Sequence, residues 1–99
     1  MAQLIVVSWR DIPAQVIVKA GRATARRQLS ERFQKAIDMC AMRVGAKDED
    51  AYLAEWRRGD PVEVDGELEA AADKAAQDLE SAYTDDRLRR LIDSAGFDA

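Results

Sequence analysis

One apolar stripe in the middle of the chain constrains the fold more than any other feature. Its members recur at spacings of three and four residues and are Leu29, Phe33, Ala36, Ile37, Cys40 and Val44. At about 100° per residue they share one face of a helix, while charged residues such as Glu31 and Lys35 lie on the opposite face. The sequence therefore predicts a long amphipathic helix over residues 23–44, with Thr24 as its N-cap and Gly45 at its end.

Two short segments ahead of this stripe predict β-strands. Residues 3–9 are apolar on both faces, which is typical of an inner strand that is covered on each side. Residues 11–14 contain a proline and favour a turn, and residues 15–20 alternate apolar and polar side chains, so the two strands form a β-hairpin. An isolated hairpin is only marginally stable, and residues 62–64 are the candidate for a third strand. Without that strand, the edge of the hairpin is free to pair with another chain.

The second half of the chain predicts shorter helices. Residues 48–59 open with three acidic side chains, which suits a helix N-terminus, and Tyr52, Leu53 and Trp56 are expected to face inward. Asp65 and Thr84 are the expected caps of two further helices. The apolar faces of these helices contain Leu68, Ala71, Ala72, Ala75, Leu79 and Ala82 in the first, and Leu88, Leu91 and Ile92 in the second. The 99 residues thus predict a single α+β domain, in which the hairpin packs against the long helix and the shorter C-terminal helices.

Charge is unevenly distributed along the sequence. Residues 1–45 hold eight Lys and Arg against three Asp and Glu (+5), and residues 46–99 hold seven against sixteen (−9). The simplest interpretation is that the acidic half folds against the basic half. The alternative is that the basic half meets an external anion, nucleic acid included, although the net charge of −4 repels DNA at long range.

Four cations gather around the start of the predicted long helix, and they are Lys19, Arg22, Arg26 and Arg27. Cations at a helix N-terminus oppose the helix dipole, whereas the free backbone N–H groups there favour an anion. The four side chains are therefore candidates for binding a phosphate, a carboxylated ligand or the acidic surface of a partner, or for pairing with the chain's own acidic half. Trp9 is a candidate for stacking on a nucleic-acid base, or for filling the core or an interface.

Several kinds of catalytic and metal site are excluded by composition. The chain contains no histidine, which removes the commonest general base and zinc ligand and every Ser-His or Cys-His nucleophile. The single cysteine, Cys40, forms no internal disulfide and no zinc or iron–sulfur site on its own, and its place in the apolar stripe favours a buried thiol. No acidic run has the spacing of a calcium loop, and no glycine-rich phosphate loop is present. No catalytic residue, metal or cofactor is therefore predicted.

The sequence predicts neither a membrane-spanning segment nor an export signal. No apolar run approaches the roughly 20 residues that a spanning helix needs. The run at residues 4–7 is short, no basic residue precedes it and charged residues follow it, unlike a signal peptide. A lone cysteine fits a reducing compartment, so the cytoplasm is the expected location.

The segments LIVVSWRDIPAQVIVKAG and RQLSERFQKAID resemble a short bacterial family known as the virulence factor domain. A similar domain occurs in the larger conserved virulence factor C proteins, where it is joined to helical repeats. The likeness covers nearly the whole chain and is strongest from Leu4 to Asp38. The family label implies no reaction and supplies no catalytic residues. Stand-alone members tend to be encoded near folate- and corrinoid-linked methyl-transfer enzymes, which implies a small accessory subunit.

Three functional hypotheses follow from the residues and the resemblance. The leading hypothesis is a non-catalytic protein-binding module, with the resemblance implying an accessory subunit of a one-carbon enzyme system; its partner is another protein or a second copy of the chain. The alternative is a nucleic-acid-associated protein that uses the basic cluster and Trp9, with affinity that falls steeply with salt. A small enzyme that uses arginines and carboxylates is the least favoured.

Overall fold

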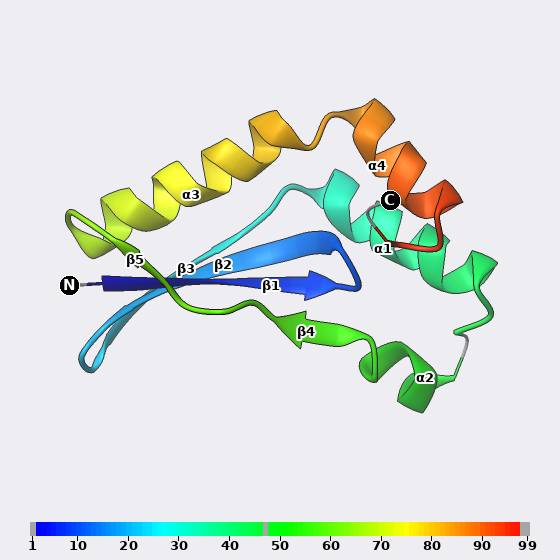
Figure 1. The fold of residues 1–99 in the computed structure, drawn as a ribbon, viewed down its shortest axis with the longest axis horizontal. Helices are drawn as coiled ribbons and strands as arrows, with labels where there is room; N and C mark the ends of the chain where they lie inside the picture. Colours follow the sequence, from blue (N-terminus) through cyan, green and yellow to red (C-terminus); the bar gives the residue numbers. More distant parts are fainter. Residues whose placement is uncertain (1, 47, 98–99) are drawn as a thin grey trace.

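The computed structural model describes residues 2–46 and 48–97 and has an α+β fold, with a curved antiparallel sheet and four helices (Figure 1). The elements in chain order are β1 (Ala2–Trp9), β2 (Ile12–Ala20), β3 (Ala23–Gln28), α1 (Glu31–Arg43), α2 (Glu49–Leu53), β4 (Trp56–Arg58), β5 (Val62–Val64), α3 (Leu68–Ala82) and α4 (Asp85–Asp93). The predicted hairpin is β1 with β2, and the predicted third strand is β5. The α+β prediction is therefore confirmed.

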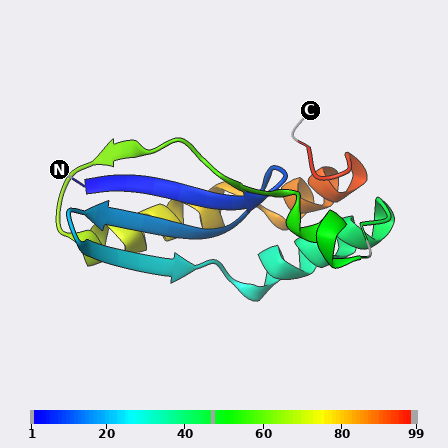
Figure 2. The same ribbon diagram turned by 90° about the horizontal axis from the view of Figure 1, so that it is seen from below.

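Strand β1 lies inside the sheet, as its apolar composition predicts. The strand order is β3-β2-β1-β4, and β5 pairs with the other end of β1. Residues 7–9 of β1 pair with β4, and residues 2–4 pair with β5. Helix α3 lies over one face of the sheet, whereas no helix of the described residues crosses the opposite face where β1, β2 and β3 run side by side (Figure 2). Helix α3 therefore covers one face of β1. No helix of the described residues covers the other face, although Ile5 on that face is only 8% exposed.

The predicted position of the start of the long helix is wrong. Residues 23–28 form β3, which pairs with β2, and α1 begins only at Glu31 with Ser30 as its N-cap. Thr24 is consequently a strand residue. Gly21, with φ of 59°, lies in the two-residue turn that joins β2 to β3, and the left-handed region that it occupies suits such tight hairpins. The turn sends the chain back along β2 before a helix can form.

The apolar stripe of α1 is buried as predicted. Phe33, Ile37 and Cys40 are at most 1% exposed. They belong to a cluster that also contains Trp9, Ile12, Leu29, Ala36, Ala41, Leu88, Leu91 and Ile92. Side chains from the hairpin and from α4 therefore enclose α1 from two sides. Burial raises the pKa of the Cys40 thiol, and the nearby charges of Arg10 and Arg43 offset only part of this effect. The predicted buried thiol is confirmed.

Helix α3 covers the sheet through small side chains. Ala72 is fully buried and packs with Ala2, Val18 and Ala25 of the three long strands. Small residues at these positions let the helix approach the sheet closely. The N-cap is Glu67, not the predicted Asp65, and its carboxylate accepts hydrogen bonds from the N–H groups of the first turn.

The two remaining helices differ in how well the sequence predicts them. Helix α4 begins as predicted, because the hydroxyl oxygen of Thr84 accepts a hydrogen bond from the Arg87 N–H at 3.2 Å. Helix α2 is shorter than predicted and ends before Trp56, which begins β4. Tyr52 and Trp56 nevertheless face the core, with ring centroids 6.0 Å apart. The prediction that Leu53 also faces inward is wrong, because this side chain is 56% exposed. The β4 pairing with β1 takes the place of the last helical turn.

A cluster of polar contacts joins the start of α1 to the end of α3. Glu80 accepts hydrogen bonds from the Ser30 N–H at 2.7 Å and the Ser30 hydroxyl at 2.8 Å, and it pairs with Arg32 at 3.2 Å. Partial burial raises the pKa of Glu80, but the hydrogen bonds from Ser30 and the charge of Arg32 outweigh it, so the pKa of Glu80 is lowered overall. These contacts fix the point at which the strand β3 gives way to a helix.

Replacing Ile37 by alanine should lower the free energy of unfolding by about 2–5 kcal/mol, because Ile37 is fully buried and its removal leaves a cavity. Met42→Ala is the matched control on the same helix, since Met42 is 71% exposed, and its effect should stay within about 0.5 kcal/mol. Urea unfolding followed by circular dichroism measures both. Equal effects of the two changes would contradict the burial of the α1 stripe.

Glu80→Gln should reduce stability at pH 7 and have a smaller effect in acid. The pKa of Glu80 is lowered in the folded state, so its carboxylate contributes stability above the unfolded-state value of about 4.3 and loses it as the pH falls through the folded-state value. Urea midpoints of both chains at pH 7 and pH 3 test this. A difference between the chains that does not change with pH would refute it.

Candidate functional site: the basic edge of the sheet

The structure brings the predicted cations together, but not at a helix N-terminus. Lys19 lies near the end of β2, Arg22 lies in the following turn, and Arg26 and Arg27 lie on β3. Helix α1 starts three residues after β3 ends, at Glu31. The prediction of an anion held by the dipole of the long helix is therefore wrong, because the backbone N–H groups beside these cations belong to a strand.

The strand register separates the side chains into two faces. Gln3, Lys19 and Thr24 are paired across β1, β2 and β3, and so are Ile5, Ile17 and Arg26. Paired residues in antiparallel strands point to the same face. Leu4, Val18 and Ala25 occupy the alternate positions and pack against α3. Lys19 and Arg26 therefore lie on the face that no helix of the described chain covers, which we call the open face (Figure 2).

Arg27 lies on the opposite face from Arg26 and is paired within the chain. Its guanidinium donates hydrogen bonds to Glu69 and, at 2.6 Å, to Asp73, both on α3. The hydrogen bonds to Glu69 and Asp73 raise the pKa of Arg27. The structure therefore supports the interpretation that Arg27 pairs with the acidic half of the chain.

Lys19, Arg22 and Arg26 are exposed to solvent. Within residues 2–46 and 48–97, their side chains make no ion pair and no hydrogen bond, whereas Arg10, Arg32 and Arg43 are all paired with acids from the second half. The charged group of each of these side chains lies in water and is not neutralised by a neighbour, so it can pair with an external anion. The three residues are the part of the predicted cluster that is free to meet a ligand, and we call them the basic edge.

Trp9 is not a stacking platform. The side chain is fully buried, and its indole N–H donates a hydrogen bond to the Tyr52 carbonyl oxygen at 2.9 Å. The two rings are tilted at 53° with centroids 5.9 Å apart. A base can stack only on an exposed ring face. Trp9 therefore fills the core, which was one of the two interpretations of this residue.

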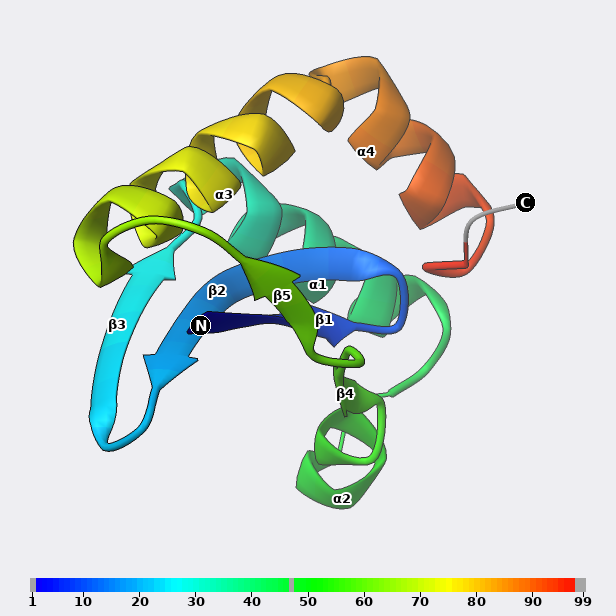
Figure 3. The ribbon, with the colours of Figure 1, turned by 60° about the vertical axis from the view of Figure 1, so that its left-hand side comes forward.

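Strand β3 forms an outer edge of the sheet: it pairs with β2 on one side, and no described strand pairs with it on the other side (Figure 3). The Leu29 N–H donates a hydrogen bond to the Ala14 carbonyl oxygen at 2.9 Å, so Ala14 and Leu29 form a hydrogen-bonded pair at the end of the β2–β3 ladder. Because hydrogen-bonded and non-hydrogen-bonded pairs alternate, the backbone groups of Thr24, Arg26 and Gln28 point away from β2. The Arg26 carbonyl oxygen accepts a hydrogen bond from the Arg27 guanidinium at 2.7 Å, and the other groups form a row of donors and acceptors that a further strand can use.

Arg10 is a prominent charged residue that the sequence does not single out. It follows Trp9 in the β1–β2 turn with φ of 52°, and its guanidinium pairs with Glu55 at 3.2 Å and donates to the Ala95 carbonyl oxygen at 2.6 Å. The guanidinium also lies over the rings of Trp9 and Phe97, at 5.2 and 4.8 Å from their centroids. These contacts connect the hairpin to the segment between α2 and β4 and to the segment after α4, so the role of Arg10 is structural.

Two further properties bear on the kind of site present. Among the described residues, no group of three or more His, Cys, Asp or Glu side chains gathers where it could hold a metal ion. No helix of the described chain is long and apolar enough to cross a bilayer.

The fold and the site together define a small α+β domain whose sheet ends in a basic strand with an unpaired outer edge. Residues 7–92 match the sequence profile of a family described as virulence factor, so the chain belongs to the virulence factor family. The resemblance noted from the N-terminal segments is thereby confirmed. Comparisons with curated proteins and with solved structures gave no significant match.

Arg27→Gln should lower the urea midpoint of unfolding, whereas Arg26→Gln should leave it unchanged. The two residues are neighbours on one strand and carry the same charge, but only Arg27 contacts Glu69 and Asp73. Chemical unfolding of the two variants beside the parent chain measures the difference. Destabilisation by Arg26→Gln equal to that by Arg27→Gln would show that Arg26 also has an internal partner.

Proposed function

We propose that this protein is a non-catalytic binding module that adds an extended, acidic segment of a partner protein to the outer edge of β3. The proposal rests on one observation, which is that the unpaired edge strand carries the basic edge beside it. Strand addition gains its affinity from main-chain hydrogen bonds and its selectivity from side chains. Here Thr24, Arg26 and Gln28 supply the main-chain groups, and Lys19, Arg22 and Arg26 select for negative charge.

Charge favours a different protein over a second copy as the partner. In a dimer with two-fold symmetry, each β3 would lie beside the other, and both copies of Arg22 and Arg26 would share one edge. Like charges that face each other across strands are destabilising. An acidic segment instead complements the basic edge, and this complementarity raises the rate of encounter.

The resemblance drawn from the sequence supports a narrower form of the proposal. In that form the partner is a component of a folate- or corrinoid-linked methyl-transfer system, and this chain is its accessory subunit. Nucleic acid is the less favoured ligand, because the net charge of −4 is repulsive at long range and Trp9 is buried. A salt titration distinguishes these ligands, since phosphate contacts make affinity fall steeply with salt.

Arg22→Glu combined with Arg26→Glu should abolish capture of the partner and leave the urea midpoint unchanged. The tagged chain is expressed at its native level in its host, and co-purified proteins are identified by mass spectrometry. Lys74→Glu combined with Arg90→Glu is the matched control, because both residues are exposed, lie on α3 and α4, and give the same change in charge. The control should capture the partner as the parent chain does.

Hydrogen exchange gives a second measurement on the same complex. In the free chain the amides of Thr24, Arg26 and Gln28 should exchange faster than those of Ala25 and Arg27, which face β2, and the partner should protect them. Purification that yields no larger partner would count against the proposal. Captured partners that remain bound to the Arg22→Glu, Arg26→Glu chain, or no added protection along β3, would overturn the proposed binding mode.

A further inference from the structure

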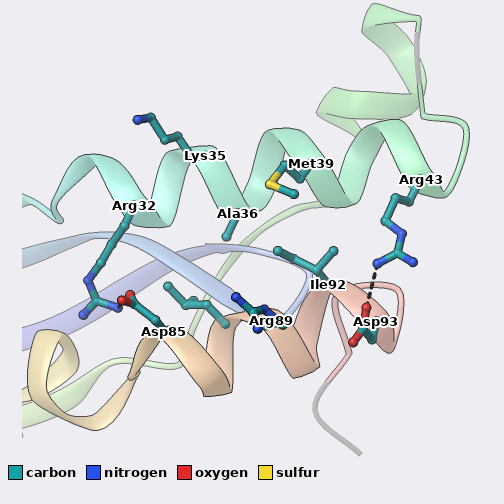
Figure 4. A pocket seen from close by; sticks show the side chains of 10 residues that line it. Arg32, Lys35, Ala36, Met39, Arg43, Asp85, Arg89, Ile92 and Asp93 are labelled. Atoms are coloured by element: carbon teal, nitrogen blue, oxygen red, sulfur yellow. Dashed lines mark hydrogen bonds and ion pairs between the residues drawn. The ribbon is translucent and has the colours of Figure 1, made fainter.

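We propose that the groove between α1 and α4 is a second docking site, and that it binds an amphipathic α-helix from a partner protein with acidic residues beside its apolar stripe. The groove encloses about 420 Å³ and lies between the outward sides of the two helices (Figure 4). It shares no lining residue with the basic edge of the sheet. The inference does not depend on the function proposed above.

The floor of the groove is apolar. Ala36 and Met39 line it from α1, and Leu88 and Ile92 line it from α4. Met39 is 55% exposed, although it lies one turn from Ala36 and next to the buried Cys40. Methionine is flexible and polarisable, and it is frequent on surfaces that receive the apolar face of a helix. The other three floor residues are at most 9% exposed, so Met39 is the floor residue that a group from outside the described part of the chain would bury.

The rim of the groove is basic. Arg32, Lys35 and Arg43 line it from α1, and Arg89 lines it from α4. The acids of the rim are Asp85 and Asp93, which pair with Arg32 at 3.3 Å and with Arg43 at 2.6 Å. These ion pairs lie at the two ends of the groove (Figure 4). Arg89 has no ion pair within the described residues, so the middle of the rim favours an acidic occupant.

The length and construction of the groove suit a short helix. Arg32 and Arg43 are eleven residues apart on α1, which corresponds to about 16 Å, or three helical turns. The lining residues follow helical spacings of three and four on both α1 and α4. A third helix that lies along both would pack its apolar side chains between theirs, as helices do when they occupy a groove.

A second copy of the chain supplies no suitable helix. Helix α3 buries its apolar face on its own sheet, and α1 and α4 bury theirs against each other and the hairpin. Helix α2 has only five residues. In the part of the chain that the structure describes, no helix of three turns has an apolar stripe to spare. The occupant is therefore assigned to a different protein.

A photo-cross-linker in the groove tests the proposal. The full chain carries Met39→p-benzoylphenylalanine, is expressed at its native level and is irradiated, and the cross-linked segment is mapped by mass spectrometry. Met42→p-benzoylphenylalanine is the matched control, because Met42 lies on the same helix, is 71% exposed and does not line the groove. Position 39 should label one segment that position 42 does not. That segment should carry apolar residues at helical spacing with Asp or Glu beside them.

A synthetic peptide with the mapped sequence completes the test. It should gain helical circular dichroism on binding, and Lys35→Glu combined with Arg89→Glu should weaken its affinity at least tenfold. Arg22→Glu combined with Arg26→Glu should leave that affinity unchanged, which separates this site from the basic edge of the sheet. The absence of a cross-link at position 39, or a cross-link to this same chain or to an extended or basic segment, would overturn the proposal. Binding to phosphatidylglycerol vesicles that Met39→Glu abolishes would also overturn it, in favour of a lipid surface.

Discussion

The packing of α1 between the end of the hairpin and α4 is the interaction on which the rest of the structure depends. Trp9 and Ile12 contact the α1 stripe from one side, and α4 contacts it from the other. Because α1 is held in this position, Glu80 at the end of α3 can contact Ser30 and Arg32 at the start of α1. Helix α3 then lies along the sheet formed by the strands that come before α1 in the chain. Helix α3 thereby covers one face of the sheet, and the strand register places the free cations Lys19 and Arg26 on the other face.

The sequence predicts those elements whose periodicity is carried by large apolar residues. The α1 stripe and the two long strands belong to this group, whereas the cap at Thr84 is predicted from its hydroxyl side chain. The sequence does not predict strand β3, because five of its six residues are Ala, Arg or Gln, and the contacts that make it a strand lie elsewhere in the chain. Pairing with β2 overrides local propensity there. The signal that was present is the Gly21 turn, which directly follows an alternating strand.

The two interpretations of the charge distribution apply to different residues of the same cluster. Arg26 and Arg27 are adjacent in sequence, yet Arg27 pairs with α3 and Arg26 faces solvent, because successive residues of a strand point to opposite faces. A helix at the same positions would place both on neighbouring parts of one surface. The strand register therefore decides which cations stabilise the fold and which can bind a partner, and composition alone contains no information about that register. For the same reason, the candidate site could be predicted only as a set of residues, without its geometry.

The single thiol of the protein lies where the hairpin turn, α1 and the segment after α4 meet. The backbone of Gly96 is so close to the Cys40 sulfur and the Arg10 side chain that a Cβ at position 96 would lie 3.1 Å from both. Gly96 also accepts a hydrogen bond from the Asp11 N–H at 2.8 Å through its carbonyl oxygen. Because Cys40 is fully buried, a thiol reagent can reach the sulfur only after the structure around it opens. The rate at which Cys40 is modified in the native protein therefore reports how often that end of the molecule opens, without any introduced label.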